Sequence, residues 1–138
     1  MSYAGDVTPS EAWKMLSQDK SARLVDVRTR PEWSFVGVPD LSRLGKQTLF
    51  LSWQGYPAMQ ISPDFVAELA KAVPDRQTPL FFLCRSGARS KAAAMAVTAA
   101  GYARCYNVSE GFEGNLDDER HRGKTGGWKA AGLPWVQE

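Results

Sequence analysis

The sequence has 138 residues, of which 43% are hydrophobic and 23% charged, a composition typical of a folded domain rather than a disordered chain. Its 17 basic and 15 acidic residues leave a formal charge of +2, too small to predict binding to nucleic acid. No apolar run has the length of a membrane span, and the first residues lack the basic and apolar regions of a secretory signal. We therefore expect a single cytoplasmic domain over residues 1–138 that binds neither nucleic acid nor membrane.

The first half of the chain predicts helices and strands in alternation. Thr8-Pro9-Ser10-Glu11 places a capping residue, a proline and a glutamate at the spacing of a helix start, so we expect a helix from there to about Asp19. After it we predict a strand over residues 22–27, one helical turn over 32–35, a loop over 37–40 and a second strand over 48–52.

The second half continues the alternation. Ser62-Pro63-Asp64 opens a predicted helix whose apolar residues recur at helical spacing as far as Val73. Residues 79–83 are so short and so uniformly apolar that they predict a strand buried on both faces. The alanine-rich residues 88–100 predict a helix, and residues 103–108 a further strand. This order predicts an α/β fold with a central parallel sheet flanked by helices on both faces.

The C-terminal part differs in composition from the rest. Residues 116–127 are charged and rich in glycine and are expected to form a surface loop, in which His121 is solvated among other charged residues. The alternative is that this segment shapes the entrance for the acceptor. Residues 128–138 carry Trp128 and Trp135, so we expect this tail to dock on the body of the domain.

The most informative segment follows the buried strand: Cys84, Arg85, Ser86, Gly87, Ala88, Arg89 and Ser90. Ligands of open α/β sheets bind beyond the carboxyl ends of the strands, which is where this segment lies. The start of the following helix carries a partial positive charge and unpaired N–H groups, and both favour a thiolate. A tight turn at Gly87 can direct successive N–H groups inward. The pattern predicts that Cys84 is a nucleophile in an anion-binding loop.

The charges around this loop support an anionic ligand. From residue 76 to residue 109 the chain has no acidic residue and five basic ones, Arg76, Arg85, Arg89, Lys91 and Arg104. The forked guanidinium groups of Arg85 and Arg89 match oxyanions well. We expect both arginines to contact the ligand.

Cys84-Arg85-Ser86-Gly87-Ala88-Arg89-Ser90 after a hydrophobic strand resembles the active-site loop of rhodanese (thiosulfate sulfurtransferase) domains. Two further motifs occur in the family's order. Leu24-Val25-Asp26-Val27-Arg28 with Glu32-Trp33 resembles the first-strand signature, and Tyr106-Asn107-Val108 with Glu110-Gly111-Phe112 resembles the strand and turn after the active-site helix. The resemblance spans roughly residues 8–135. The chain departs from the family at Gly37-Val38-Pro39, where members often carry a histidine.

The resemblance implies a rhodanese-like fold and a sulfurtransferase that carries sulfur as a persulfide on Cys84. The donor would be a small anion, thiosulfate or a persulfide, and the acceptor a thiol or cyanide; a protein donor or acceptor also fits. Arg85 and Arg89 would bind the anion, Ser86 and Ser90 would supply hydroxyl hydrogen bonds, and the loop backbone through Gly87 and Ala88 would stabilise the persulfide. The resemblance implies no cofactor and no metal.

Two other functions stay open at this point. The same loop suits a persulfide carrier or partner-binding module that does not turn over thiosulfate. A cysteine phosphatase or arsenate reductase is less favoured, because the four residues between Cys84 and Arg89 are one fewer than phosphatases have, which leaves a smaller pocket.

Three further side chains and the second cysteine need an interpretation. We expect Asp26, Arg28 and Glu32 to form a structural ion-pair cluster near a strand end, and the alternative is that they contribute to the site, because strand ends converge there. Cys105 is expected to be a buried thiol, and the alternative is a resolving cysteine that forms a disulfide with Cys84.

Overall fold

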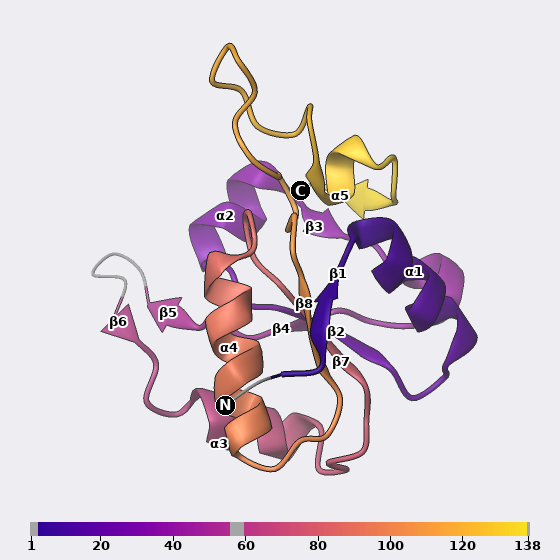
Figure 1. The fold of residues 1–138 in the computed structure, drawn as a ribbon, viewed down its shortest axis with the longest axis vertical. Coiled ribbons are helices and arrows are strands. Elements are labelled where there is room, and N and C mark those ends of the chain that lie inside the picture. The colour runs from indigo at the N-terminus through magenta and orange to yellow at the C-terminus, as the bar shows by residue number, and fades with distance from the viewer. Residues whose placement is uncertain (1–2, 56–59, 138) are drawn as a thin grey trace.

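The computed structural model describes residues 3–55 and 60–137. Five strands form the central sheet in the order β1-β8-β7-β2-β4, and every neighbouring pair is parallel. Helices cover both faces of this sheet (Figure 1), which confirms the predicted α/β fold. The strands are β1 (Gly5–Val7), β2 (Arg23–Asp26), β4 (Leu49–Phe50), β7 (Leu80–Leu83) and β8 (Cys105–Val108).

Smaller elements surround the sheet. β3 (Val38–Pro39) pairs antiparallel with β9 (Trp135–Val136), and β5 (Gln54–Gly55) with β6 (Gln60–Ile61). The helices are α1 (Pro9–Gln18), α2 (Arg30–Val36), α3 (Phe65–Ala72), α4 (Ala88–Ala99), α5 (Gly127–Ala130) and the 3-10 turn η1 (Ser42–Leu44).

β7 lies at the centre of the sheet and divides the core in two. Leu80 and Phe82 point to the face that α3 and α4 cover, whereas Phe81 and Leu83 point to the face of α1 and α5. All four side chains are buried, as the apolar run predicts. Burying both faces of one strand stabilises the position of its carboxyl end, and Cys84 follows directly.

Local signals in the sequence explain where several helices begin. At the start of α1 the Thr8 side chain accepts a hydrogen bond from the backbone N–H of Glu11, and the Glu11 carboxylate accepts one from the backbone N–H of Thr8. This capping box confirms the predicted helix start. The helices predicted from residues 62 and 88 are α3 and α4.

The structure corrects the sequence-based prediction at short elements. Residues 37–40, predicted as a loop, contain β3, whose partner β9 lies near the other end of the chain. The three residues of β1 were not predicted as a strand, and they form the edge of the sheet beside β8. Both elements are defined by distant partners, so their own few residues carry little signal.

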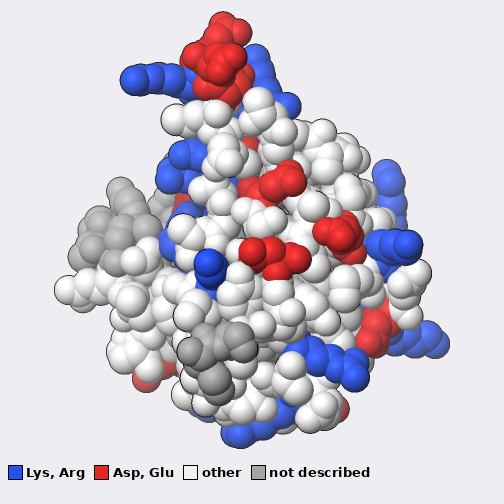
Figure 2. All heavy atoms as spheres, in the orientation of Figure 1, with Lys and Arg blue, Asp and Glu red and all other residues white. Residues whose placement is uncertain are grey.

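The C-terminal residues pack on the face of α1. Trp128 is fully buried and lies edge-to-face against Trp13, and its indole N–H donates to the carbonyl of Pro134. Between β8 and α5, residues 114–126 protrude from the body (Figure 1), and charged side chains of both signs gather at the protruding tip (Figure 2). We call residues 114–126 the protruding loop.

Candidate active site

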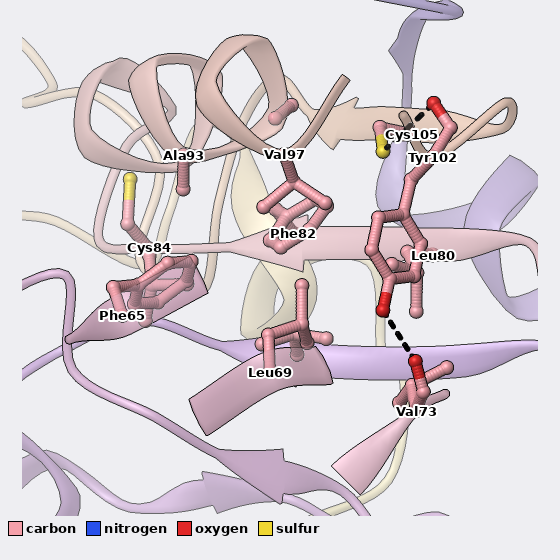
Figure 3. Packing of buried hydrophobic residues seen from close by; sticks show 13 residues of the cluster. Phe65, Leu69, Val73, Leu80, Phe82, Cys84, Ala93, Val97, Tyr102 and Cys105 are labelled. Carbon is pink, nitrogen blue, oxygen red and sulfur yellow. Dashed lines mark hydrogen bonds between the residues drawn. The ribbon is translucent and has the colours of Figure 1, made fainter. Parts of the chain in front are cut away.

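Cys84 lies directly beyond the carboxyl end of β7, beside the start of α4 (Figure 3). Its side chain is 1% exposed and packs in the core face that α3 and α4 cover. The backbone N–H of Gly87 donates a hydrogen bond to its Sγ over 3.1 Å, and the hydroxyl oxygen of Ser90 lies 3.1 Å from the same sulfur. Two hydrogen-bonding groups of the loop therefore converge on this thiol.

Two glycines let the backbone close tightly around the sulfur. Gly87 adopts φ +110°, and a Cβ there would lie 2.2 Å from the carbonyl oxygen of Ser109. Gly111 adopts φ +68°, and a Cβ there would lie 2.5 Å from the carbonyl carbon and oxygen of Arg85. Any side chain at these positions meets both a disfavoured backbone conformation and a backbone clash.

Residues 84–90, which we call the cysteine loop, are held by the backbone of the turn after β8. The N–H of Phe112 donates to the carbonyl of Cys84 over 2.8 Å, and the N–H groups of Glu113 and Gly114 donate to the carbonyl of Arg85 over 3.0 and 3.2 Å. These bonds connect the start of the protruding loop to the cysteine loop, so the position of each segment depends on that of the other.

Ser90 lies in the first turn of α4, with its side chain turned into the protein. It is fully buried, and its hydroxyl is 2.6 Å from Oδ1 of Asn107 on β8. The amide nitrogen of Asn107 donates in turn to Asp6 on β1 over 3.0 Å, and the Tyr3 hydroxyl donates to the same carboxylate oxygen over 2.6 Å. Asn107 belongs to the Tyr106-Asn107-Val108 motif, but nothing in the sequence predicts this network.

Arg89 is held by an acidic partner from another element. Its two terminal nitrogens bind the two carboxylate oxygens of Glu32 on α2 over 2.7 and 2.9 Å. Burial acts to raise the pKa of Glu32, but the hydrogen bonds from Arg89 and from the Thr29 backbone outweigh it and lower that pKa to about 2. The guanidinium of Arg89 therefore has a bound counter-ion at neutral pH, a partner that the sequence analysis does not predict for it.

The expected ion-pair cluster is smaller than predicted. Asp26 and Arg28 form a fully buried pair with a closest distance of 2.8 Å, and Arg28 also donates to the carbonyl of Gly37. Glu32 does not join them, because Arg89 engages both of its oxygens. The prediction was correct for Asp26 and Arg28 and wrong for Glu32.

A pocket of about 600 Å³ opens beside the loop and contains cations from two segments. Arg85 and Arg89 come from the cysteine loop, and Arg122 comes from the protruding loop. In the described parts of the chain, Arg85 and Arg122 make no ion pair, unlike Arg89. We call this space the arginine pocket; it is lined by Thr29, Pro31, Glu32, Val36, Gln54, Arg85, Arg89, Glu113 and Arg122.

Arg122 lines this pocket, and the sequence does not single it out, because a charged, glycine-rich segment predicts a surface loop first and a part of the acceptor entrance only as the alternative. Its guanidinium donates to the carbonyl of Gly114 over 2.7 Å, which holds the side chain against the base of the loop. His121 beside it is exposed. The remaining predicted residues are Ser86, which is half-buried, and Ala88, which is exposed.

Cys105 lies too far from Cys84 to form a disulfide with it. In the sheet, Cys105 pairs with Leu80 at the start of β7, whereas Cys84 follows its end (Figure 3). Four residues of strand correspond to about 13 Å, and bridged Cα atoms must lie within about 7 Å. Burial raises the pKa of the Cys105 thiol. The alternative of a resolving cysteine is therefore wrong, and Cys105 is a buried thiol.

Residues 3–55 and 60–137 contain neither a membrane-spanning helix nor a metal-binding cluster. No helix there is long and apolar enough to cross a membrane. No group of three or more histidine, cysteine, aspartate or glutamate side chains there could hold a metal ion.

Comparison with known proteins assigns the family. The sequence model of the STR4 middle domain matches residues 4–138. The chain belongs to the STR4 middle domain family. Relatives of this family member include uncharacterized proteins of Rickettsia rickettsii and Rickettsia conorii, each 44% identical over 94% of this chain and 95% of the relative. A rhodanese-like domain-containing chloroplast protein of Arabidopsis thaliana is 26% identical over 96% of this chain and 26% of its own length.

Two solved structures are similar to this chain in fold. The crystal structure of Rv0390 from Mycobacterium tuberculosis is 52% identical and superposes with a TM-score of 0.92, covering 99% of this chain and all of that one. The polysulfide-sulfur transferase of Wolinella succinogenes is 22% identical with a TM-score of 0.63, covering 96% of this chain and 78% of that one, and supports the fold. This STR4 middle domain member has a rhodanese-like fold.

Proposed function

We propose that the protein is a sulfurtransferase that carries sulfane sulfur on Cys84 between an anionic donor and a thiophilic acceptor. One observation carries the proposal: Cys84 follows the central strand, and its Sγ receives the Gly87 N–H and contacts the Ser90 hydroxyl. The same groups suit a sulfur atom that bears negative charge, because each is able to donate a hydrogen bond to it. The rhodanese-like relatives support sulfur chemistry in general.

The first step loads the cysteine. After the thiol proton has left, the Cys84 thiolate attacks the outer sulfur of thiosulfate or the terminal sulfur of a donor persulfide. The bond between that sulfur and the rest of the donor breaks, and its electron pair leaves with sulfite or with the donor thiolate. Cys84 is then a persulfide, and no external oxidant is consumed.

The second step unloads it. A thiolate or cyanide attacks the terminal sulfur of the persulfide, and the electron pair of the broken sulfur–sulfur bond returns to Cys84. The acceptor leaves as a persulfide or as thiocyanate. Cys84 is again a thiolate and can react with the next donor, so the two half-reactions predict ping-pong kinetics.

The arginine pocket supports an anionic donor. Arg85 and Arg122 are its cations without an acidic partner in the described residues, so we assign donor binding to them. Arg89 is paired with Glu32, and we assign it the role of fixing the first turn of α4 against α2. No metal or organic cofactor enters either half-reaction.

Intact-mass measurement tests the proposal directly. The reduced protein is incubated with thiosulfate, desalted and weighed, and cyanide is then added. We expect a gain of one sulfur atom, located on Cys84 by peptide analysis, and its loss to cyanide. Cys84→Ser should take up no sulfur, whereas Cys105→Ala, the matched control, should take up one.

Other outcomes would overturn the proposal. Sulfur uptake from a persulfide-loaded protein but not from thiosulfate or a small persulfide would identify a carrier module. Hydrolysis of an aryl phosphate without sulfur uptake would identify a phosphatase. Uptake that persists in Cys84→Ser and disappears in Cys105→Ala would show that the reacting cysteine is misassigned.

A further inference from the structure

A chain of polar side chains leads from the cysteine to the protein surface, and the proposed sulfur transfer does not account for most of it. Ser90 and Asn107 are 0% and 3% exposed, whereas Asp6 is exposed. The successive distances are 3.1 Å from Cys84 Sγ to Ser90 Oγ, 2.6 Å from Ser90 Oγ to Asn107 Oδ1 and 3.0 Å from Asn107 Nδ2 to Asp6 Oδ1. The three residues after Cys84 come from α4, β8 and β1.

Asp6 fixes the direction of the hydrogen bonds in this chain. Hydrogen bonds from Tyr3 and Asn107 lower the pKa of Asp6, so its carboxylate is ionised and can only accept. Asn107 must therefore turn its NH₂ group to Asp6 and its carbonyl oxygen to Ser90. Because a carbonyl oxygen cannot donate, the hydroxyl of Ser90 is the donor in the 2.6 Å bond.

Ser90 has a single hydroxyl hydrogen, so donating it to Asn107 excludes donating it to Cys84. The carbonyl of Gly87 is also near this hydroxyl, but at 3.2 Å it is a weaker acceptor than Asn107 at 2.6 Å. A neutral Cys84 thiol fits this arrangement, since its S–H donates to the Ser90 oxygen. A negatively charged sulfur has no hydrogen to give and needs a donor instead.

We propose that Asn107, oriented by Asp6, is a positioning residue that competes with a negatively charged Cys84 sulfur for the Ser90 hydroxyl hydrogen. The hydroxyl hydrogen of Ser90 then has two positions, one directed to Asn107 and one directed to the Cys84 sulfur. The inference rests on the proposed function only in taking Cys84 as the reacting sulfur. Alkylation of Cys84 requires no sulfur donor, so it tests the role of Asn107 independently of sulfur transfer.

The basic side chains near the cysteine loop are not part of the hydrogen-bonded series from Cys84 to Asp6. Arg89 interacts electrostatically with Cys84, Asp26 and Glu32, and Lys91 interacts with Asp6. Arg85 extends from the loop toward the arginine pocket. Cys84 shares its core cluster with apolar side chains, among them Val27 just after β2, Phe65 of α3 and Ala93 of α4. A variant of Asn107 leaves all of these groups in place.

The test measures the alkylation rate of Cys84 by iodoacetamide as a function of pH, with peptide mass analysis separating it from Cys105. Asn107→Leu removes the competing acceptor, so the midpoint of the rate–pH curve should fall by about one pH unit. Asp6→Asn lets the Asn107 amide turn over and should move the midpoint in the same direction. Ser90→Ala removes the donor and should raise it.

Double variants separate positioning from a general structural or electrostatic effect. In the Ser90→Ala background, Asn107→Leu and Asp6→Asn should leave the midpoint where Ser90→Ala alone places it, because both act through the Ser90 hydroxyl. A general change in packing or charge would shift the midpoint in either background. Asp6 lies at the exposed surface, so its variant keeps the test available if Asn107→Leu does not fold.

Two results would overturn the proposal. One is a midpoint that rises or stays unchanged in both Asn107→Leu and Asp6→Asn. The other is a shift of equal size with and without the Ser90 hydroxyl. Loss of sulfur uptake with the expected alkylation shifts intact would contradict the proposed function and leave the role of Asn107 standing.

Discussion

Both carboxylate oxygens of Glu32 bind Arg89, so the second arginine of the cysteine loop is tied to helix α2. The side chains are 57 positions apart in the chain and only 20% and 17% exposed. A paired, half-enclosed guanidinium is oriented by its partner and no longer offers both donors of its fork to a ligand. The pair therefore connects the position of α2 to the first turn of α4.

Glu32→Gln tests the strength of this pair. Glutamine retains the side-chain oxygen that caps Thr29 but loses the charge, so the variant isolates the ion pair. Because the folded-state pKa of Glu32 is lowered from 4.5 to about 2, its stabilisation is full above pH 4.5 and is lost as pH falls through about 2. We expect a stability difference on the order of 3 kcal/mol at neutral pH, diminished by solvent screening. Urea unfolding of both proteins from pH 2 to 7 measures it, and a pH-independent difference would contradict the assignment.

Gly111→Ala should disturb the cysteine loop from the turn that braces it. The new Cβ would lie 2.5 Å from the Arg85 carbonyl, in addition to the cost of φ +68°. We expect a loss of more than about 2 kcal/mol of unfolding free energy and of most sulfur uptake. Gly123→Ala is the matched control, since it has φ +81° but no atom within 4 Å, and it should cost about 1 kcal/mol and retain uptake. Equal losses in both variants would show that the brace is unimportant.

Arg122→Gln tests donor binding by the protruding loop. Removing a cation of the arginine pocket should raise the KM for thiosulfate about threefold to tenfold and change kcat less. Lys124→Gln removes a charge from the same loop at an exposed position outside the pocket lining and should leave KM unchanged. Steady-state rates at two salt concentrations measure both, and equal effects of the two variants would point to net charge instead of a bound donor.

Cys105→Ala should affect stability and not chemistry. Its thiol is fully buried and burial raises its pKa, so it is a poor nucleophile at neutral pH. We expect a destabilisation of about 1 kcal/mol from the lost packing and an unchanged rate of sulfur transfer. Thermal unfolding and turnover of the variant give both values; a large fall in turnover without unfolding would contradict this account.

The parts of the fold that follow from local pattern were predictable. The apolar run of β7, the capping box of α1 and the alanines of α4 each carry their signal within a few neighbouring residues. The same holds for the cysteine loop, whose position between β7 and α4 follows from the order of these elements.

Contacts between distant residues were not predictable in this way. The Arg89–Glu32 pair joins positions 57 apart, and the Asn107–Asp6 bond joins positions 101 apart. Arg122 reaches the arginine pocket because the backbone of Glu113 and Gly114 is hydrogen-bonded to the cysteine loop. The local composition does not indicate this attachment. Each of these contacts depends on the register of the sheet or on the path of a long connection.

The two thiols of the chain, Cys84 and Cys105, lie near opposite ends of β7. A sulfur loaded on Cys84 therefore has no thiol of its own molecule to which it can pass. The loaded state must persist until an outside molecule meets it, so its lifetime is inversely proportional to the concentration of that molecule. Under the proposed function, the domain holds one sulfur atom, and the release of that atom is second order.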